Sequence, residues 1–411
     1  MSDKAQPLAV IGAGIAGACC AFALREDGHE VVVIDENEPG SGCSHGNAGQ
    51  FNLGTTLPIA LPGMWKQVPK WLADPLGPLA VSWPYLPRAA PWLLRWLWES
   101  RQSRASRHSL ALQALMITCH DRYRAMLGPD ADGLIVQSGH LHVWERAEKT
   151  AGDLLSLRML ADKGVHPREL DAGAISDIEP ALAPIYRRGL FFPHNGYTTN
   201  PARLVQTLIR RSGATLHTAR ATGFRRDGNR VTTVETTAGA IACAGVVIAA
   251  GHASRDLAVM LGHRVPLEVE RGYHAMLPAP GITLRVPVSN GEHTFVATPM
   301  EHGLRFAGTV EIAGIAPPPN WQRADLLLTH ATRMLPGLRT DAPSRWMGFR
   351  PSFPDSLPAI DRMPGLANAY AAFGHGHYGI SLSPMTGQLV ADLVAGRAMT
   401  VDAAAYRVTR F

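Results

Sequence analysis

Residues 8–17 read Leu8-Ala9-Val10-Ile11-Gly12-Ala13-Gly14-Ile15-Ala16-Gly17. The four apolar residues predict a short buried strand, and the glycines that follow predict a tight turn. Helical residues continue from about Ile15 to Asp27, and Gly28 stands where a helix often ends. A second apolar run, Glu30 to Ile34, ends at Asp35. Together these segments predict one strand–helix–strand unit of a parallel sheet.

The spacing of the three glycines gives this unit a chemical meaning. Gly12 makes the tight turn, Gly14 lets a pyrophosphate approach the backbone, and Gly17 lets helix and strand pack closely. The helix N-terminus adds free N–H groups and partial positive charge. Asp35 stands where a carboxylate would bond the hydroxyls of an adenosine ribose. The unit predicts a bound dinucleotide without separating FAD from NAD, and its expected contacts are Gly12, Gly14, Ile15, Ala16, Gly17, Asp35 and Glu36.

Three further glycine-rich segments separate the two cofactors. Residues 41–49 form a small-residue loop that could pass close under a flat cofactor, and residues 246–251 are a second apolar strand running into a glycine turn. Residues 374–379 are a third glycine turn before a helix, whose N-terminus would stabilise the negative charge of a reduced flavin. These segments favour FAD, because one strand–helix–strand unit does not explain the C-terminal glycines. The expected contacts are Ser44, His45, Gly46, Asn47, Ala48, Gly49, Ala250, Gly251, Gly374, His375, Gly376, His377, Tyr378, Gly379 and Ile380.

Length and composition fit a globular protein of two domains. The chain has 411 residues, of which 46% are apolar and 18% charged. A net charge of +5 favours anionic partners such as a nucleotide cofactor, a carboxylate substrate or an anionic membrane surface, and the scattered arginines argue against nucleic acid as a partner. The five cysteines lack metal-ligand spacing, so we expect reduced thiols and no metal site. Neither a signal peptide nor a membrane span is expected, which predicts a cytoplasmic location.

Five segments resemble the FAD-dependent amine and D-amino-acid oxidoreductases. They are residues 12–17, 44–49, 249–251, 350–360 and 374–387. Within that family the resemblance is to bacterial D-amino-acid dehydrogenases and their D-hydroxyproline dehydrogenase relatives. Ser356 departs from the glycine common in the amino-acid dehydrogenases. Residues 271–274 and 374–379 look closer to the hydroxyproline type.

The resemblance implies a mixed α/β (α+β) fold of two domains. One would be a Rossmann-like FAD-binding domain, formed by residues 1–56, 186–255 and 345–411. The other would be a substrate-binding domain built on an antiparallel sheet, formed by residues 57–185 and 256–344.

The resemblance also implies where the substrate binds. Arg350 is the candidate that grips a substrate carboxylate, because its planar guanidinium matches that group; a structural salt bridge is the alternative. Tyr273 could bond the same carboxylate and His274 the amine or a ring hydroxyl, with packing roles as the alternative. His45 could attach FAD covalently, but we expect no such bond, because most of the similar relatives bind FAD without one.

The implied reaction is oxidation of a D-amino or cyclic imino acid, such as cis-4-hydroxy-D-proline, to the imine by hydride transfer to flavin N5. A quinone or another carrier would accept the electrons. One alternative is a glycine/sarcosine-type amine oxidase that uses oxygen. Another is a flavin-bearing subunit of a larger oxidoreductase complex.

Residues 57–98 hold six of the nine tryptophans. Residues 92–98 are rich in tryptophan and leucine and are followed by Arg101, Arg104 and Arg107, a profile typical of a helix on a membrane interface. A helix packed over the substrate domain is the alternative. A peripheral contact with the inner membrane face is therefore a second expectation for the location.

Overall fold

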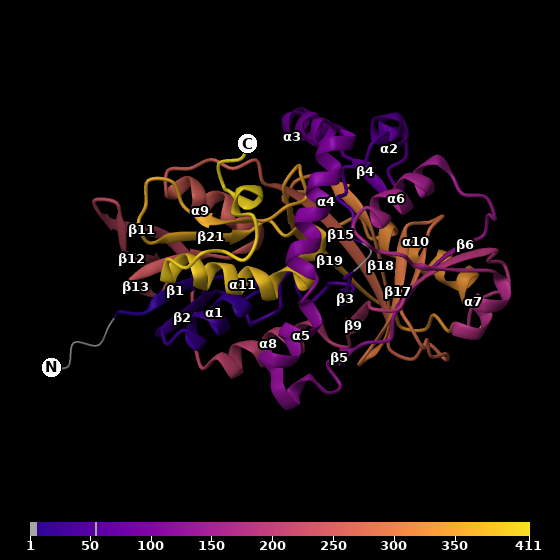
Figure 1. Ribbon diagram of the computed structural model, residues 1–411, viewed down its shortest axis with the longest axis horizontal. Coiled ribbons are helices and arrows are strands. Elements are labelled where there is room, and N and C mark those ends of the chain that lie inside the picture. Colours follow the sequence, from indigo (N-terminus) through magenta and orange to yellow (C-terminus); the bar gives the residue numbers. More distant parts are fainter. Residues whose placement is uncertain (1–5, 54–55) are drawn as a thin grey trace.

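The computed structural model describes residues 6–53 and 56–411 (Figure 1). Two sheets dominate it, a six-stranded sheet on the left of Figure 1 and a nine-stranded sheet on the right. The indigo N-terminal and yellow C-terminal segments lie side by side around the first of these. The large cavity described below lies between the two sheets.

The six-stranded sheet has the order β10-β2-β1-β14-β21-β20. All pairs are parallel except β20 with β21. At its centre Val10 of β1 lies between Val33 of β2 and Val247 of β14. Both faces of the sheet are packed against other elements, so its central strands are continuous apolar runs. The bounds are β1 Leu8–Ile11, β2 Val31–Asp35, β10 Thr215–Thr218, β14 Gly245–Ile248, β20 Ala359–Arg362 and β21 Ala369–Phe373.

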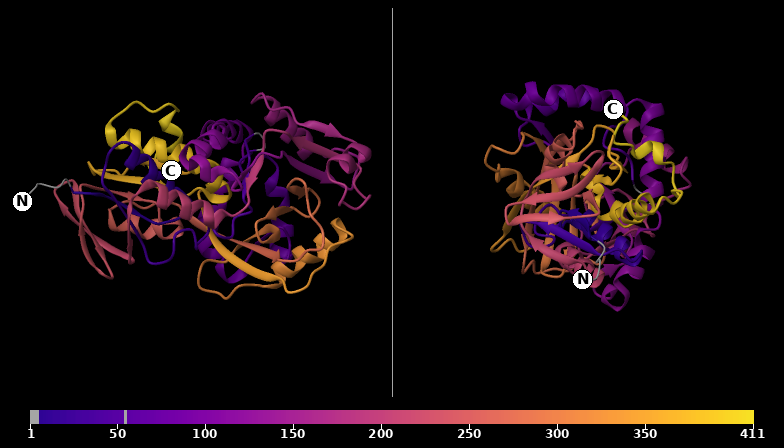
Figure 2. Two further views of the ribbon diagram at one scale, coloured as in Figure 1. Left: turned by 90° about the horizontal axis from the view of Figure 1, so that it is seen from below. Right: turned by 90° about the vertical axis from the view of Figure 1, so that its left-hand side faces the viewer.

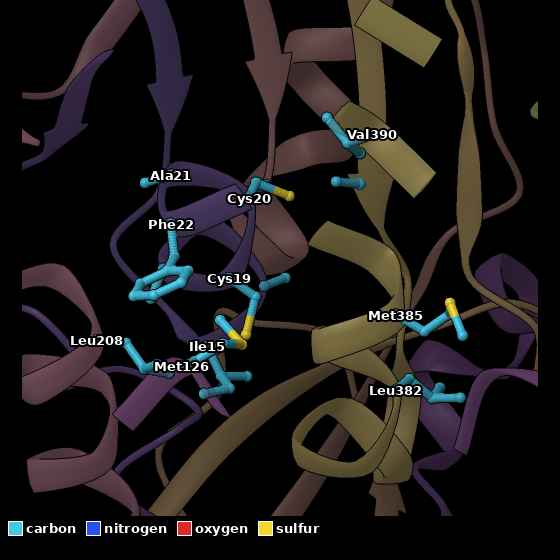
Figure 3. Close-up of a cluster of buried hydrophobic side chains, with 14 of the residues drawn as sticks. Ile15, Cys19, Cys20, Ala21, Phe22, Met126, Leu208, Leu382, Met385 and Val390 are labelled. Atoms are coloured by element: carbon cyan, nitrogen blue, oxygen red, sulfur yellow. The ribbon is translucent and has the colours of Figure 1, made fainter. Parts of the chain in front are cut away.

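Helices α1 (Ile15–Glu26), α8 (Pro201–Ser212) and α11 (Gly379–Ala395) pack together over one face of this sheet. Figure 3 shows side chains of this core, with Cys19 and Cys20 buried between the helices. Gly387 lets α11 approach α1, because a β-carbon there would overlap the Cys19 carbonyl oxygen. All five cysteines are free thiols, as predicted.

The nine-stranded sheet has the order β19-β15-β18-β17-β16-β6-β8-β7, with β4 beside β18. It is antiparallel except for the β16–β6 and β18–β4 pairs. Helix α10 (Gln322–Met334) packs on one face, against β15 and β18. The bounds are β4 Leu79–Val81, β6 His140–Trp144, β7 Arg168–Leu170, β8 Arg188–Phe192, β15 Glu268–Leu277, β16 Val288–Asn290, β17 Phe295–Met300, β18 Gly303–Ile312 and β19 Ser344–Ser352.

The remaining strands form two small sheets. The hairpin sheet β11-β12-β13 lies at the end of the molecule remote from the nine-stranded sheet (Figure 2). The sheet β3-β9-β5 joins residues far apart in the chain. Their bounds are β3 Gln50–Phe51, β5 Ile135–Val136, β9 Gly196–Thr198, β11 Ala221–Asp227, β12 Arg230–Thr236 and β13 Gly239–Ala242.

The remaining α-helices are α2 Val68–Ala73, α3 Leu86–Glu99, α4 Gln102–Met116, α5 Cys119–Leu127, α6 Ala151–Ala161, α7 Ala172–Ile178 and α9 Ser254–Met260. The sequence pattern predicts one helix over residues 110–127, where α4 ends and α5 follows. The structure interrupts it at Ile117 and Thr118, two β-branched residues of low helix propensity. Within the described ranges no helix is both long and apolar enough to cross a bilayer.

The division into two domains stays a prediction, but several elements pack across its boundaries. Strands β8 and β19 pair within the nine-stranded sheet, although the bounds that the resemblance implies put them in the FAD domain. Helices α4 and α5 pack on the helical core around α1 and α11, although they were assigned to the substrate domain. A local pattern predicts that a segment is a strand or helix but carries no information on its partner.

Candidate active site

The turn between β1 and α1 has the close contacts that its glycines predict. Gly12 has a φ of +110°, and a β-carbon there would overlap the Ala249 carbonyl oxygen. A β-carbon on Gly17 would overlap the Gly12 carbonyl oxygen, so Gly17 serves helix–strand packing. A β-carbon on Gly14 would lie 3.6 Å from its nearest neighbour, Ser44 Oγ, and would overlap no atom of the described residues. Gly14 therefore keeps the approach to the turn open.

Two side chains hold this turn in place. Asp35 Oδ2 accepts a hydrogen bond of 2.7 Å from the Ala13 N–H, and its Oδ1 accepts one of 2.9 Å from the Asn37 N–H. Ser44 Oγ accepts a hydrogen bond of 3.0 Å from the N–H of Ile15, at the start of α1. Helix α1 begins after a glycine, so this cap comes from the distant 44–49 loop.

A cavity of about 1090 Å³ runs from this turn to the nine-stranded sheet. Its volume is slightly above the roughly 300–1,000 Å³ typical of small-molecule sites. From the first sheet it is lined by the β1–α1 turn, Asp35 and Glu36. The predicted residues on its wall are Gly12, Gly14, Ile15, Ala16, Asp35, Glu36, Ser44, Gly46, Asn47, Ala48, Ala250, Gly251, Arg350, Gly374, His375, Gly376, His377, Tyr378, Gly379 and Ile380.

Five predicted site residues do not line this cavity: Gly17, His45, Gly49, Tyr273 and His274. The family resemblance implies that Tyr273 and His274 bind the same substrate. Side chains alternate along a strand, however, so the side chain of Tyr273 lies on the opposite face of β15 from that of His274. There its hydroxyl donates a hydrogen bond of 2.6 Å to Glu311 Oε2 and accepts one of 3.1 Å from the Asn320 N–H. This geometry gives Tyr273 a packing role.

His274 positions the 44–49 loop rather than facing the cavity. Its Nδ1 donates to the Gly46 carbonyl oxygen at 3.1 Å, and its ring stacks on Trp346 at a centroid distance of 5.2 Å. Burial, with the nearby Arg305, lowers the pKa of His274 to about 3, so the ring is neutral. A β-carbon on Gly46 would overlap Trp346, which explains the small residue in the loop.

Arg305 of β18 also supports the site, although it was not among the predicted residues. Its Nη1 donates to the carbonyl oxygens of His45 and Asn47, at 2.9 and 2.6 Å. Burial lowers the pKa of Arg305 to about 10, and the group stays charged. No motif surrounds Arg305 in the sequence, so only its contact across 258 residues reveals this role.

The third glycine turn brings α11 to the cavity. His375 is buried, and its Nε2 lies 2.9 Å from Thr386 Oγ1 within α11. Burial lowers the pKa of His375 to about 4. The Tyr378 hydroxyl donates to the Leu57 carbonyl oxygen at 2.7 Å. The turn thus presents the N-terminus of α11, a 17-residue helix, at the cavity wall.

Arg350 lies on β19 at the wall of the cavity. Its Nη1 donates to the Thr309 carbonyl oxygen and to His377 Nε2, both at 3.2 Å. Burial lowers the pKa of Arg350, while Cys43 and Glu270 oppose that shift. Within the described part of the chain, both hydrogen bonds of this guanidinium use Nη1, so Nε and Nη2 remain as a fork for a carboxylate.

A glycine-turn sheet whose cavity extends to an antiparallel sheet and ends at an arginine is the arrangement that the sequence predicts for a flavin-dependent oxidoreductase. The chain belongs to the DAO family, described as FAD dependent oxidoreductase, which it matches over residues 7–393. The predicted family, the FAD cofactor and the mixed α/β fold class are therefore confirmed.

Named relatives cover nearly the whole chain. A D-amino-acid oxidase of Bradyrhizobium diazoefficiens is 38% identical over 415 residues, with 98% of each chain covered. A D-amino acid dehydrogenase of Paramagnetospirillum magneticum is 32% identical, again with 98% of each covered. The structure of glycine oxidase from Geobacillus kaustophilus is similar in fold, with a TM-score of 0.72, 23% identity and 98% of each chain covered.

Proposed function

We propose that the protein oxidises a D-amino acid or cyclic imino acid to the corresponding imine, with Arg350 as the anchor of the substrate carboxylate. The observation that carries this is the free Nε–Nη2 edge of Arg350, a residue of the cavity wall, within the described residues. Two relatives with names that specify D-amino acids, at 38% and 32% identity, support the substrate class.

The residues at the cavity wall fit FAD. Asp35 would hold the ribose hydroxyls, and the N-terminus of α1 would hold the pyrophosphate. The 44–49 loop, supported by Arg305 and His274, would surround the flavin ring together with residues 374–380. Bound FAD supplies the hydride acceptor for the oxidation.

The nine-stranded sheet supplies further polar groups to the cavity wall. His142, Ser289 and Asn290 line the cavity. Within the described residues the buried Nε2 of His142 has no hydrogen-bond partner, and burial lowers the pKa of His142 to about 4. Strands β6 and β19 are five positions apart in this sheet, so His142 lies too far from Arg350 to contact the same small substrate. The choice of cis-4-hydroxy-D-proline therefore rests on the family resemblance of residues 271–274 and 374–379.

The test is an anaerobic absorbance titration of the purified protein with D- and L-amino acids, glycine, sarcosine and cis-4-hydroxy-D-proline. Bleaching of the flavin band by D-substrates alone is the expected result. Arg350→Ala should lose most of kcat/KM through a higher KM, while Arg345→Ala, on the same strand but more exposed, should keep it. No bleaching by any amino acid, or an unchanged kcat/KM for Arg350→Ala, would refute the proposal.

We infer that a quinone or another carrier accepts the electrons, as in a dehydrogenase. Oxygen is the second candidate, because the relative at 38% identity is named an oxidase. Stoichiometric hydrogen peroxide during turnover in air would select oxygen. Turnover that requires an added quinone or dye, without peroxide, would select the carrier.

We also infer a peripheral membrane contact through helix α3. Its inner tryptophans, Trp92 and Trp96, are buried in a cluster with residues of the nine-stranded sheet, which is the packing alternative. Its outer face exposes Leu94 and Trp98, with the Arg101 guanidinium 3.4 Å from the Trp98 ring centroid. Flotation with anionic vesicles should carry the protein upward, and Leu94→Gln with Trp98→Gln should abolish this. A wild-type protein that stays entirely in the soluble fraction rules the contact out.

A further inference from the structure

Next to Arg350, three buried polar atoms meet at a small internal cavity. They are Glu270 Oε2, Ser352 Oγ and His377 Nδ1, and within residues 6–53 and 56–411 none makes a well-oriented hydrogen bond. All three residues line a cavity of about 10 Å³, which is close to the space of one water molecule. His377 lines both this cavity and the large one, so it separates the buried group from the substrate end.

One imidazole connects Glu270 with Arg350. Glu270 of β15 lies opposite Arg350 of β19 in the strand pairing. His377 Nδ1 lies 3.2 Å from Glu270 Oε2, and His377 Nε2 lies 3.2 Å from Arg350 Nη1. A guanidinium only donates hydrogen bonds, so Nε2 accepts and the ring proton is on Nδ1, toward Glu270.

The charges around Glu270 make its ionisation sensitive to a new anion. The side chain is 4% exposed. The groups that face it are Arg350, His377, Ser352 and Tyr378, together with Glu268 on its own strand. Burial raises the pKa of Glu270 to about 7, against the attraction of Arg350. Burial, with Arg350 beside it, lowers the pKa of His377 far below its usual range, so the bridge between them is neutral.

We propose that Glu270 takes up one proton when a carboxylate binds Arg350, so that the guanidinium does not have to balance two carboxylates. The reasoning is electrostatic: an added negative charge on the same cation stabilises the protonated form of a nearby carboxylate. This inference rests on the proposed role of Arg350 in binding the substrate. Glu270 acts through Arg350 and His377 and is a positioning residue.

The same proton balance suits an amino-acid substrate. The substrate ammonium must lose a proton before its carbon is oxidised. That proton goes to solvent while Glu270 takes one up, which gives a neutral amine and a neutral carboxylic acid, with no net change in charge. With a carboxylate that has no ammonium group, the proton comes from solvent.

The test uses the holoprotein and pyrrole-2-carboxylate, a carboxylate with no oxidisable α-hydrogen. Its Kd is measured by the change in flavin absorbance from pH 5.5 to 8.5, and proton uptake is measured by calorimetry in two buffers of different ionisation enthalpy. For the wild type, Kd should rise by up to about tenfold per pH unit above pH 7, with uptake approaching one proton. Glu270→Gln should show a flat Kd, tighter than wild type at pH 8.5, and no proton uptake.

A matched control is Glu268→Gln, two residues away on the same strand and also buried, which should keep the wild-type pH slope. A merely structural role for Glu270 predicts weaker binding of the carboxylate to Glu270→Gln at every pH, and that result overturns the inference. If Glu270→Gln does not fold, the wild-type calorimetry decides, because binding without proton uptake also overturns it. Binding that needs Arg350 but carries no proton leaves the proposed function intact, whereas binding unaffected by Arg350→Ala removes both.

Discussion

The guanidinium of Arg350 lies over Gly272, where a β-carbon would overlap its Cζ. The two residues stand on the same face of the neighbouring strands β15 and β19, so Gly272 provides the space in which the guanidinium crosses β15. The position of Arg350, the candidate carboxylate anchor, therefore depends on the absence of a β-carbon at Gly272. No sequence motif marks this relationship, because only the pairing of the two strands brings Gly272 and Arg350 together.

Gly272→Ala should displace the Arg350 guanidinium while leaving the sheet intact. Because misplacing a binding group by about 1 Å can cost roughly 10²-fold in rate, we expect kcat/KM to fall by about that factor. Steady-state kinetics with the best D-substrate, alongside FAD content, measure this. Gly223→Ala in β11, where a β-carbon would meet nothing closer than 3.8 Å, is the control. Equal kinetics for both variants would show that Arg350 does not need the space at Gly272.

Gly14→Ala and Gly17→Ala should fail in different ways. The β-carbon at 17 would overlap the Gly12 carbonyl, so this variant should melt at a clearly lower temperature or not fold. The β-carbon at 14 meets no protein atom closer than 3.6 Å, so this variant should fold but lose FAD. Circular dichroism melts and flavin absorbance separate the two effects. Full FAD content in folded Gly14→Ala would contradict the expected approach of the pyrophosphate.

Arg305→Met should loosen the loop of residues 44–49. The change leaves the carbonyl oxygens of His45 and Asn47 without their donor, at a cost below the roughly 1–3 kcal/mol of a fully buried group, because both are only partly buried. We expect weaker FAD binding and a lower melting temperature, measured by flavin release on dilution and by thermal unfolding. Arg345→Met, which breaks an exposed ion pair with Asp325, should change little. A wild-type FAD affinity in Arg305→Met would show that the loop of residues 44–49 keeps its conformation without Arg305.

Stability should fall as the pH drops below 6.5. Burial lowers the pKa of His120 to about 4, and both of its ring nitrogens lack partners among the described residues. Below pH 6.5 the His120 ring is protonated in the unfolded chain but stays neutral in the folded protein. The stability is therefore fully present above that pH and falls as the pH drops toward 4. Such a histidine contributes at most about 1.4 kcal/mol per pH unit.

His120→Leu tests this directly, since it removes the titrating group and two unpaired polar atoms. Urea unfolding at about pH 7.5, 6 and 5 should show that the free energy of unfolding depends less steeply on pH, by a slope equivalent to at most about one proton. At the highest pH the variant should be no less stable than the wild type. His302→Gln, at an exposed position that leaves the core untouched, is the control. An unchanged slope in His120→Leu would mean that this ring does not resist protonation in the fold.

Ser356 stands where the family pattern has glycine, and the structure explains the difference. The resemblance expects glycine there, and the structure gives Ser356 a φ of +66°, the left-handed region that glycine adopts without strain. The serine has a contact that glycine lacks, because its Oγ accepts a hydrogen bond of 3.1 Å from the Ile59 N–H. The departure from the pattern is therefore explained by local geometry and gives no information about the substrate.

The sequence by itself determined the dinucleotide turn, the parallel strands around it and the segments that line the cofactor cavity. These features follow from local periodicity, glycine spacing and residue size, which act over a few residues at a time. The tertiary structure alone decided that Tyr273 faces away from the cavity, that His274 and Arg305 hold the 44–49 loop, and that Glu270 stands opposite Arg350. Each of these depends on strand register and on contacts between distant segments, and a one-residue change of register would turn every such side chain to the other face.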